Sequence, residues 1–186
     1  MVILRRSVFP LVIVATALAI ACGGGDGGGS DVDVADYPYP VEQPEVLEDR
    51  SHFAIGTIYP GYTSDPPTSG PHALAPVDWG VSDLPIAKEQ AVHNMEHAGV
   101  VVWYNCNAGT PLDSEACTTL RNGLGQIVTS EAAKGTRVLL TPYPAMDARI
   151  ALTSWGFLDT FDEFDAERVR LFIDTFECNF DPEHFC

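Results

Sequence analysis

The N-terminal segment constrains this chain most, because it decides which residues fold and in which compartment. Residues 1–21 carry Arg5 and Arg6 and continue into an apolar stretch of moderate length that ends in small residues. This order is typical of a signal peptide for export, and the apolar stretch is too short for a membrane-spanning helix. We therefore expect the remaining chain to fold outside the cytoplasm, where disulfides form and persist.

The end of the signal, "LAIAC", resembles the lipobox of bacterial lipoproteins, in which the cysteine, here Cys22, becomes the lipidated first residue. Leu18 stands one position earlier than is usual, so an ordinary cleaved signal remains the alternative. Residues 22–50 are rich in glycine, proline and acidic residues, and we interpret them as a flexible tether. The expected organisation is a signal peptide at 1–21, a lipidated tether at 22–50 and one globular domain at 51–186, anchored to the outer face of the cell membrane.

The net charge limits the range of partners. The formal charge of the whole chain is −16. Without Arg5 and Arg6, eight basic residues face 26 acidic ones, which gives −18. Such a surface disfavours nucleic acids and anionic lipid headgroups. We expect contact with the membrane through the lipid alone, and no particular protein partner is indicated.

The cysteines other than Cys22 fall into two closely spaced pairs. Each pair encloses a short segment rich in turn-forming residues, "NAGTPLDSEA" and "NFDPEHF". In an exported protein, this spacing predicts the disulfides Cys106–Cys117 and Cys178–Cys186. Metal binding by these thiols is the weaker alternative, because the chain has no CxxC spacing.

The hydrophobic pattern predicts a mixed set of strands and helices. Runs of β-branched, aromatic and other apolar residues predict strands within 52–60, 99–105, 136–144 and 148–157. Helices are predicted within 85–97, 113–134 and 165–177, the last with Asp165 as its N-cap. Because strands and helices do not alternate regularly, we predict an α+β fold: a small, mainly antiparallel sheet with about three helices packed largely on one face.

Histidines at helical spacing indicate a metal site. His93 and His97 are four residues apart in the predicted helix 85–97 and therefore share one face. His72 lies in the proline-rich loop "PPTSGPH", and Met146 lies in a turn between two predicted strands. If these segments meet, three imidazoles and a thioether surround one point, a donor set that suits copper. The alternative for Met146 is packing in the core.

Two further histidines, His52 and His184, are expected to be exposed and outside this site. The pentapeptide "HNMEH" also fits HxxEH, a zinc-peptidase motif that needs a carboxylate ligand from a second helix, for which Glu163 or Glu167 is suitably placed in sequence. Such peptidases are several times larger than this domain, and the helix here ends near Gly99. We therefore interpret Glu96 as a hydrogen-bond partner of the site or a member of a local salt bridge.

Several blocks of the chain resemble the bacterial domain of unknown function 3105 family. The blocks are "PPTSGPH", "WGVSDLPIAKEQAVHNMEHAGVVVWYNC", "LLTPYPAMDARIALTSWG" and "ERVRLFIDTF". They span roughly residues 50–177, and members of the family are commonly exported or tethered to membranes. The family form of the second block is similar to "VHxLEHGGV", so Met95 stands in place of leucine and Ala98 in place of glycine. The resemblance implies that Met95 packs in the core, but it implies no activity.

The resulting hypothesis is a membrane-anchored extracytoplasmic protein that binds a metal ion. Copper is the ion that the donor set favours, and the expected role is capture or delivery of the ion rather than catalysis. The residues assigned to the ion are His72, His93, His97 and Met146. One alternative is an interaction module without metal, in which the histidines hold the loop against the helix end. A small zinc hydrolase that uses HxxEH is the less favoured alternative.

Overall fold

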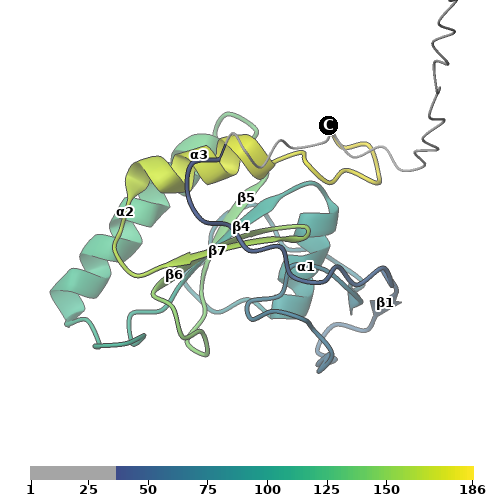
Figure 1. Cartoon of the computed structure of the whole chain (residues 1–186), viewed down its shortest axis with the longest axis horizontal. Helices are drawn as coiled ribbons and strands as arrows, with labels where there is room; N and C mark the ends of the chain where they lie inside the picture. Colours follow the sequence, from purple (N-terminus) through teal and green to yellow (C-terminus); the bar gives the residue numbers. More distant parts are fainter. Residues whose placement is uncertain (1–36) are drawn as a thin grey trace, which may run out of the picture.

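A five-stranded sheet in the order β3-β5-β4-β6-β7 forms the centre of the fold (Figure 1). The computed structural model describes residues 37–186. In chain order the elements are β1 (His52–Phe53), β2 (His72–Ala73), β3 (Gly80–Val81), α1 (Lys88–Glu96), β4 (Val100–Tyr104), α2 (Ser114–Ala132), β5 (Val138–Pro142), β6 (Ile150–Ser154), β7 (Phe157–Phe161) and α3 (Ala166–Phe176). The fold is α+β, as predicted. Among these described helices, none has the length and apolar character needed to span a bilayer.

The sheet is mixed, which corrects the expectation of a mainly antiparallel one. Strand β5 pairs in parallel with both β3 and β4. The pairs β4–β6 and β6–β7 are antiparallel. Strands β4 and β5 run in the same direction because the 19-residue helix α2 connects them, and a crossover of this length carries the chain back to the starting end of the sheet.

The three helices do not all lie on one face of the sheet. Val100 and Val102 of β4 pack in the hydrophobic cluster that α2 and α3 cover. The alternate residues, Val101 and Trp103, pack in a second cluster together with α1. The expectation of one helical face therefore holds for α2 and α3, while α1 covers the opposite face (Figure 1). Because β4 is buried on both sides, its five residues are apolar without alternation.

Two local predictions are confirmed. Both disulfides, Cys106–Cys117 and Cys178–Cys186, are formed. The side chain of Asp165 accepts hydrogen bonds from the backbone N–H groups of Glu167 and Arg168, so it caps the N-terminus of α3. These contacts hold the pKa of Asp165 below its usual value.

The domain begins earlier than expected, since residues 37–50 pack on it and do not extend away as a tether. Tyr37 is only 4% exposed and lies in the cluster beneath α3. Glu42 forms an antiparallel bridge with Leu158 of β7. Burial of the Tyr37 ring and pairing at the sheet edge outweigh the acidic, proline-rich character of this segment. The predicted signal peptide and Cys22 lie outside the described residues.

Helix α1 ends in a left-handed residue that is not glycine. Ala98 has φ 66°, and its N–H donates to the carbonyl of Met95 at 3.1 Å. A side chain costs roughly 1 kcal/mol in this conformation, which glycine adopts freely. We expect Ala98→Gly to raise the free energy of unfolding by about that amount in urea denaturation. Ala91→Gly, inside the same helix, should lower it; a loss of stability in Ala98→Gly would contradict this account.

Candidate metal site

His52 and His72 face each other because the two short strands β1 and β2 pair in parallel. Their register sets His52 opposite His72, and the backbone N–H of His72 donates to the Ser51 carbonyl at 3.0 Å. Side chains at paired positions of neighbouring strands lie on the same side of a sheet. The two ring centroids are 4.5 Å apart.

The loop before His72 is held by contacts from three other segments. The Ser69 hydroxyl accepts from the N–H of Leu47 at 2.9 Å. The Thr68 carbonyl accepts from the N–H of Gly156 at 3.0 Å. The Tyr62 hydroxyl donates to the Pro71 carbonyl at 2.9 Å. These anchors fix the backbone on both sides of Gly70 and place the His72 side chain, which is fully buried.

Helix α1 contributes the other side chains of the site. His93, Glu96 and His97 lie three and four residues apart and therefore share one face of the helix end. Val92 and Met95 pack in the core against the sheet, which confirms the packing role expected for Met95. The His93 ring lies 4.9 Å from the rings of both His52 and His72, and 4.5 Å from the ring of His97.

Backbone carbonyls determine which nitrogen of each central imidazole carries the proton. The Nδ1 of His72 is 2.8 Å from the Gly70 carbonyl, and the Nδ1 of His93 is 2.6 Å from the Ala73 carbonyl. A carbonyl oxygen only accepts, so both Nδ1 atoms must donate. In a neutral ring the lone pair then resides on Nε2, and both Nε2 atoms are directed towards other ligand-type atoms.

The Nε2 atoms are close to one another and to the Glu96 carboxylate. His72 Nε2 lies 3.1 Å from His52 Nε2 and 2.9 Å from Glu96 Oε2. His93 Nε2 lies 3.0 Å from His97 Nε2. One ligand atom from each of His52, His72, His93 and Glu96 lies within 4.8 Å of the other three. Ligand atoms about 2 Å from a tetrahedral ion are roughly 3.3 Å apart, so this spacing is near that of a metal-binding group.

The electrostatic setting favours the neutral form of His93 and the ionised form of Glu96. Burial lowers the pKa of His93, and the hydrogen bond to Ala73 only partly opposes this effect. Burial opposes ionisation of Glu96, but the hydrogen bond to His72 and the charges of His72, His52 and Arg50 outweigh it and lower the pKa of Glu96. The guanidinium of Arg50 lies 3.5 Å from Glu96 Oε1. The site therefore sets an ionised carboxylate close to the neutral imidazole of His93.

The structure brings together three of the four residues that were assigned to metal. His72 and His93 are buried within the group, and His97 adjoins His93 at the rim with 21% of its side chain exposed. Met146 is instead in the hydrophobic cluster with Met95, and its carbonyl accepts from the Asn105 side chain at 2.6 Å.

His52 was expected to be outside the site, and this expectation is wrong. Its side chain is 42% exposed, but its Nε2 atom is directed into the group. One feature of the sequence could have pointed to His52 as a site residue, because His52 begins a predicted strand. The two-residue pairing of β1 with β2 is nonlocal, however, and nothing in the sequence specifies its register.

The carboxylates proposed for a peptidase do not join the group. Glu163 is exposed and lines a surface groove beside the first turn of α2, and Glu167 lies exposed in the first turn of α3. Among the described residues, the ligand atoms clustered around the histidines include neither. The carboxylate that does reach the site is Glu96, from within the motif itself, so the second-helix ligand that this peptidase motif requires is not supplied by these residues.

Comparisons with known proteins agree with the resemblance seen in the sequence. No curated protein and no solved structure matches the chain. One family does match, over residues 60–185, a range that includes β2, all three helices and every residue of the site except His52. The chain therefore belongs to the family described as protein of unknown function DUF3105.

Proposed function

We propose that this protein binds a single metal ion through His52, His72, His93 and Glu96, and that it captures or delivers the ion outside the cytoplasm. The observation that carries the proposal is the convergence of Nε2 lone pairs, whose direction is set by the carbonyls of Gly70 and Ala73. A cation placed among these Nε2 atoms and the Glu96 carboxylate would be coordinated by them.

The contact between His72 and Glu96 supports the same interpretation. With Nδ1 already donating, a hydrogen bond from His72 Nε2 to the carboxylate requires an additional proton, which makes the ring an imidazolium. A bound cation satisfies both atoms without that proton. The hydrogen bonds from Nδ1 to carbonyls are the outer contacts that orient histidine ligands in metal proteins.

Copper is the proposed ion. Three imidazoles and a carboxylate are borderline ligands, and among divalent first-row ions such a set binds Cu²⁺ most tightly. Zn²⁺ accepts the same ligands and the same geometry, so it is the closest competitor. Without a thioether the site favours Cu²⁺ over Cu⁺. The adjacent His97 can replace one of the inner ligands as the ion enters or leaves.

Capture or delivery, rather than permanent burial of the ion, follows from the exposure of the site. His72 and His93 are buried, whereas His52 is 42% exposed and gives access from solvent. The net negative charge of the protein attracts cations to its surface. A lipid anchor on Cys22 would keep the domain at the outer face of the membrane.

Titration of the purified, metal-free domain with Cu²⁺ and Zn²⁺ tests the proposal. We expect one equivalent of Cu²⁺ to bind, more tightly than Zn²⁺, with nitrogen hyperfine structure in the electron paramagnetic resonance spectrum. His52→Ala should weaken binding by about tenfold or more, because it removes a ligand at the rim without opening the core. Failure of both ions to bind at micromolar concentration would refute the proposed function.

The non-metal interaction module is the second candidate. It is favoured by the position of His72 between the Gly70 carbonyl and Glu96, where a doubly protonated ring would hold the loop against α1. In that case the imidazoles stabilise the fold and the metal titration is negative. The same titration therefore separates the two candidates.

A further inference from the structure

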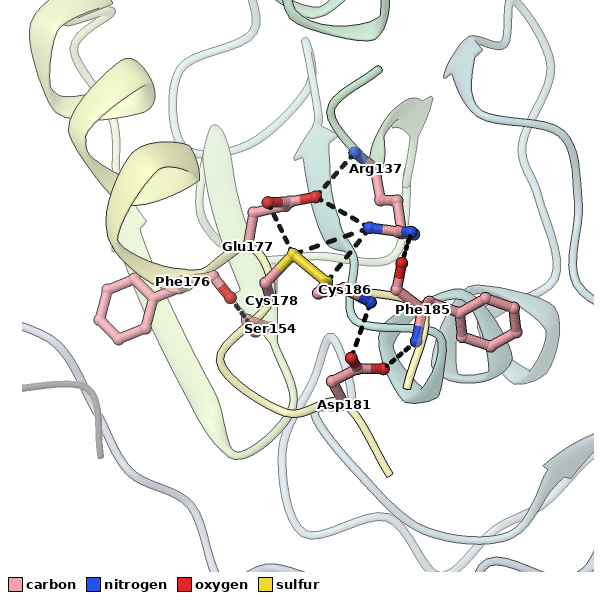
Figure 2. Close-up of a disulfide and its surroundings, with 8 residues drawn as sticks. All are labelled: Arg137, Ser154, Phe176, Glu177, Cys178, Asp181, Phe185 and Cys186. Atoms are coloured by element: carbon pink, nitrogen blue, oxygen red, sulfur yellow. Dashed lines mark hydrogen bonds and ion pairs between the residues drawn. A yellow bond between two sulfur atoms is a disulfide. The ribbon is translucent and has the colours of Figure 1, made fainter. Parts of the chain in front are cut away.

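The segment that follows α3 forms a small closed loop next to the metal site. The Cys178–Cys186 disulfide closes residues 178–186 (Figure 2). Inside the loop, the Asp181 carboxylate accepts from the N–H groups of Phe185 at 2.7 Å and Cys186 at 2.8 Å. The guanidinium of Arg137 donates to the Phe185 carbonyl. The disulfide and these contacts together hold the loop in its closed shape.

This loop contacts the site through His97. Glu183 Oε2 lies 3.1 Å from His97 Nε2, and the Phe185 ring centroid lies 4.4 Å from that of His97. The N–H of Cys178 donates to the carbonyl of Ala98 at 2.9 Å, so the start of the loop is joined to the end of α1.

A second contact connects the loop with His72 through Trp155. The Phe180 ring stacks on Trp155 at 4.6 Å, and Trp155 in turn contacts the His72 ring edge-on at 6.3 Å. The loop therefore covers the rim of the site from His97 to Trp155.

We propose that the Cys178–Cys186 disulfide is a redox-controlled clasp on the metal site. When the disulfide is intact, Glu183 and Phe185 cover His97 and retard release of the ion. When it is reduced, the loop opens and the ion leaves faster. This inference rests on the proposed function and adds the regulation of the same site.

The contacts of the loop with His97 come from exposed side chains. The Glu183 side chain is 47% exposed, and Phe185 is also exposed. Exposed ion pairs contribute little because solvent screens them. Opening the covalent ring returns conformational entropy to these residues, which favours the open loop.

The reduction requires a dithiol as electron donor. One thiolate of the dithiol attacks a sulfur of the disulfide, which forms a mixed disulfide and releases the other cysteine as a thiolate. The second thiol of the dithiol then displaces the attached cysteine, so two electrons pass to the protein and the dithiol leaves as a disulfide. Its two protons convert the cysteines to thiols.

Arg137 favours this reaction. Its Nη1 atom lies 3.2 Å from the sulfur of Cys186 and 3.6 Å from that of Cys178 (Figure 2). A guanidinium at this distance stabilises the thiolate that leaves in each step.

Ion release tests the clasp directly. The variant Cys178→Ser/Cys186→Ser is loaded with Cu²⁺, and the rate of transfer to a chelator in excess is measured. The matched control is Cys106→Ser/Cys117→Ser, which removes the disulfide between the turn after β4 and the first turn of α2. We expect release at least tenfold faster from the first variant than from the control. Equal rates would overturn the clasp.

Chemical reduction provides a second test of the clasp, in which the disulfide is opened without substitution of Cys178 or Cys186. In the Cys106→Ser/Cys117→Ser background, a water-soluble phosphine reduces the Cys178–Cys186 disulfide of the metal-free protein. The two thiols are then alkylated and the phosphine is removed before Cu²⁺ is loaded, because phosphines and free thiols reduce Cu²⁺. We expect the same acceleration of release after reduction as in the clasp variant. No acceleration, with reduction verified by mass spectrometry, would equally overturn the proposal.

A measurement without metal separates the clasp from the proposed function. Diethyl pyrocarbonate modifies accessible imidazoles, and modification of His97 is followed by peptide mass spectrometry in the metal-free protein. We expect His97 to react several times faster in Cys178→Ser/Cys186→Ser than in the control. Equal labelling overturns the clasp alone, whereas absence of metal binding by the wild-type protein overturns the proposed function.

Discussion

His93→Ala should weaken Cu²⁺ binding at least a hundredfold. The substitution removes a proposed inner ligand, whose Nδ1 is hydrogen-bonded to the Ala73 carbonyl and whose Nε2 lies 3.0 Å from that of His97. Loss of an outer contact alone typically costs ten- to a hundredfold in metal affinity, so loss of the ligand itself costs more. Competition with a chelator of known affinity measures the change.

Two variants keep this prediction testable if His93→Ala folds poorly. His93→Gln preserves most of the side-chain volume and a hydrogen-bond donor, and it should lose Cu²⁺ affinity to a similar extent. Met146→Leu is the matched control, because its side chain lies in the core cluster and the change replaces the thioether by a branched hydrocarbon of similar volume. Affinity that is unchanged in both histidine variants would refute the ligand assignment, and affinity that falls in Met146→Leu would restore Met146 as a ligand.

Arg168→Ala should lower the free energy of unfolding by about 3 kcal/mol. Arg168 forms a two-point ion pair with the carboxylate of Asp159, whose side chain is fully buried, and its Nε–Oδ2 distance is 2.8 Å. Tyr37 donates to the same carboxylate, and burial together with Asp159 raises the pKa of Tyr37. Removing the guanidinium leaves a buried charge without its partner, which is among the most destabilising single changes.

The matched control lies two residues further along α3. Arg170 is exposed, and its guanidinium reaches only the Ala166 carbonyl, at 3.2 Å. Arg170→Ala removes the same side chain from the same helix and should change stability by less than about 0.5 kcal/mol. Urea denaturation of both variants measures the difference. Equal effects would show that the Asp159 pair does not stabilise the fold as described.

The sequence was sufficient for features that depend on nearby residues. Cys106 and Cys117 are 11 residues apart, and Cys178 and Cys186 are eight apart, so few other pairings were open to them. Asp165 caps α3 through N–H groups only two and three residues away. His93 and His97 share a helix face because of the helical repeat. Each of these features follows from local geometry.

Other features depended on contacts between distant segments. The mixed sheet follows from the route of the chain through α2, and α1 covers the opposite face of the sheet from α2 and α3. The acidic composition of residues 37–50 indicated a tether. Burial of the Tyr37 ring nevertheless holds this segment against the domain. Composition averages over a segment, whereas packing depends on individual side chains.

The residues of the candidate site also fall into those that the sequence identified and those that only the structure added. By itself the sequence identified His72, His93 and His97 as histidines in constrained positions, and the metal-binding hypothesis started from them. Only the tertiary structure added His52 and Glu96 and placed Met146 in the core, because these side chains are brought together or kept apart by the register of β1 with β2 and the packing of α1. The spacing of His93 and His97 on a helix follows directly from the sequence. The distance between His52 and His72, which are 20 residues apart on different strands, depends on how the whole protein folds.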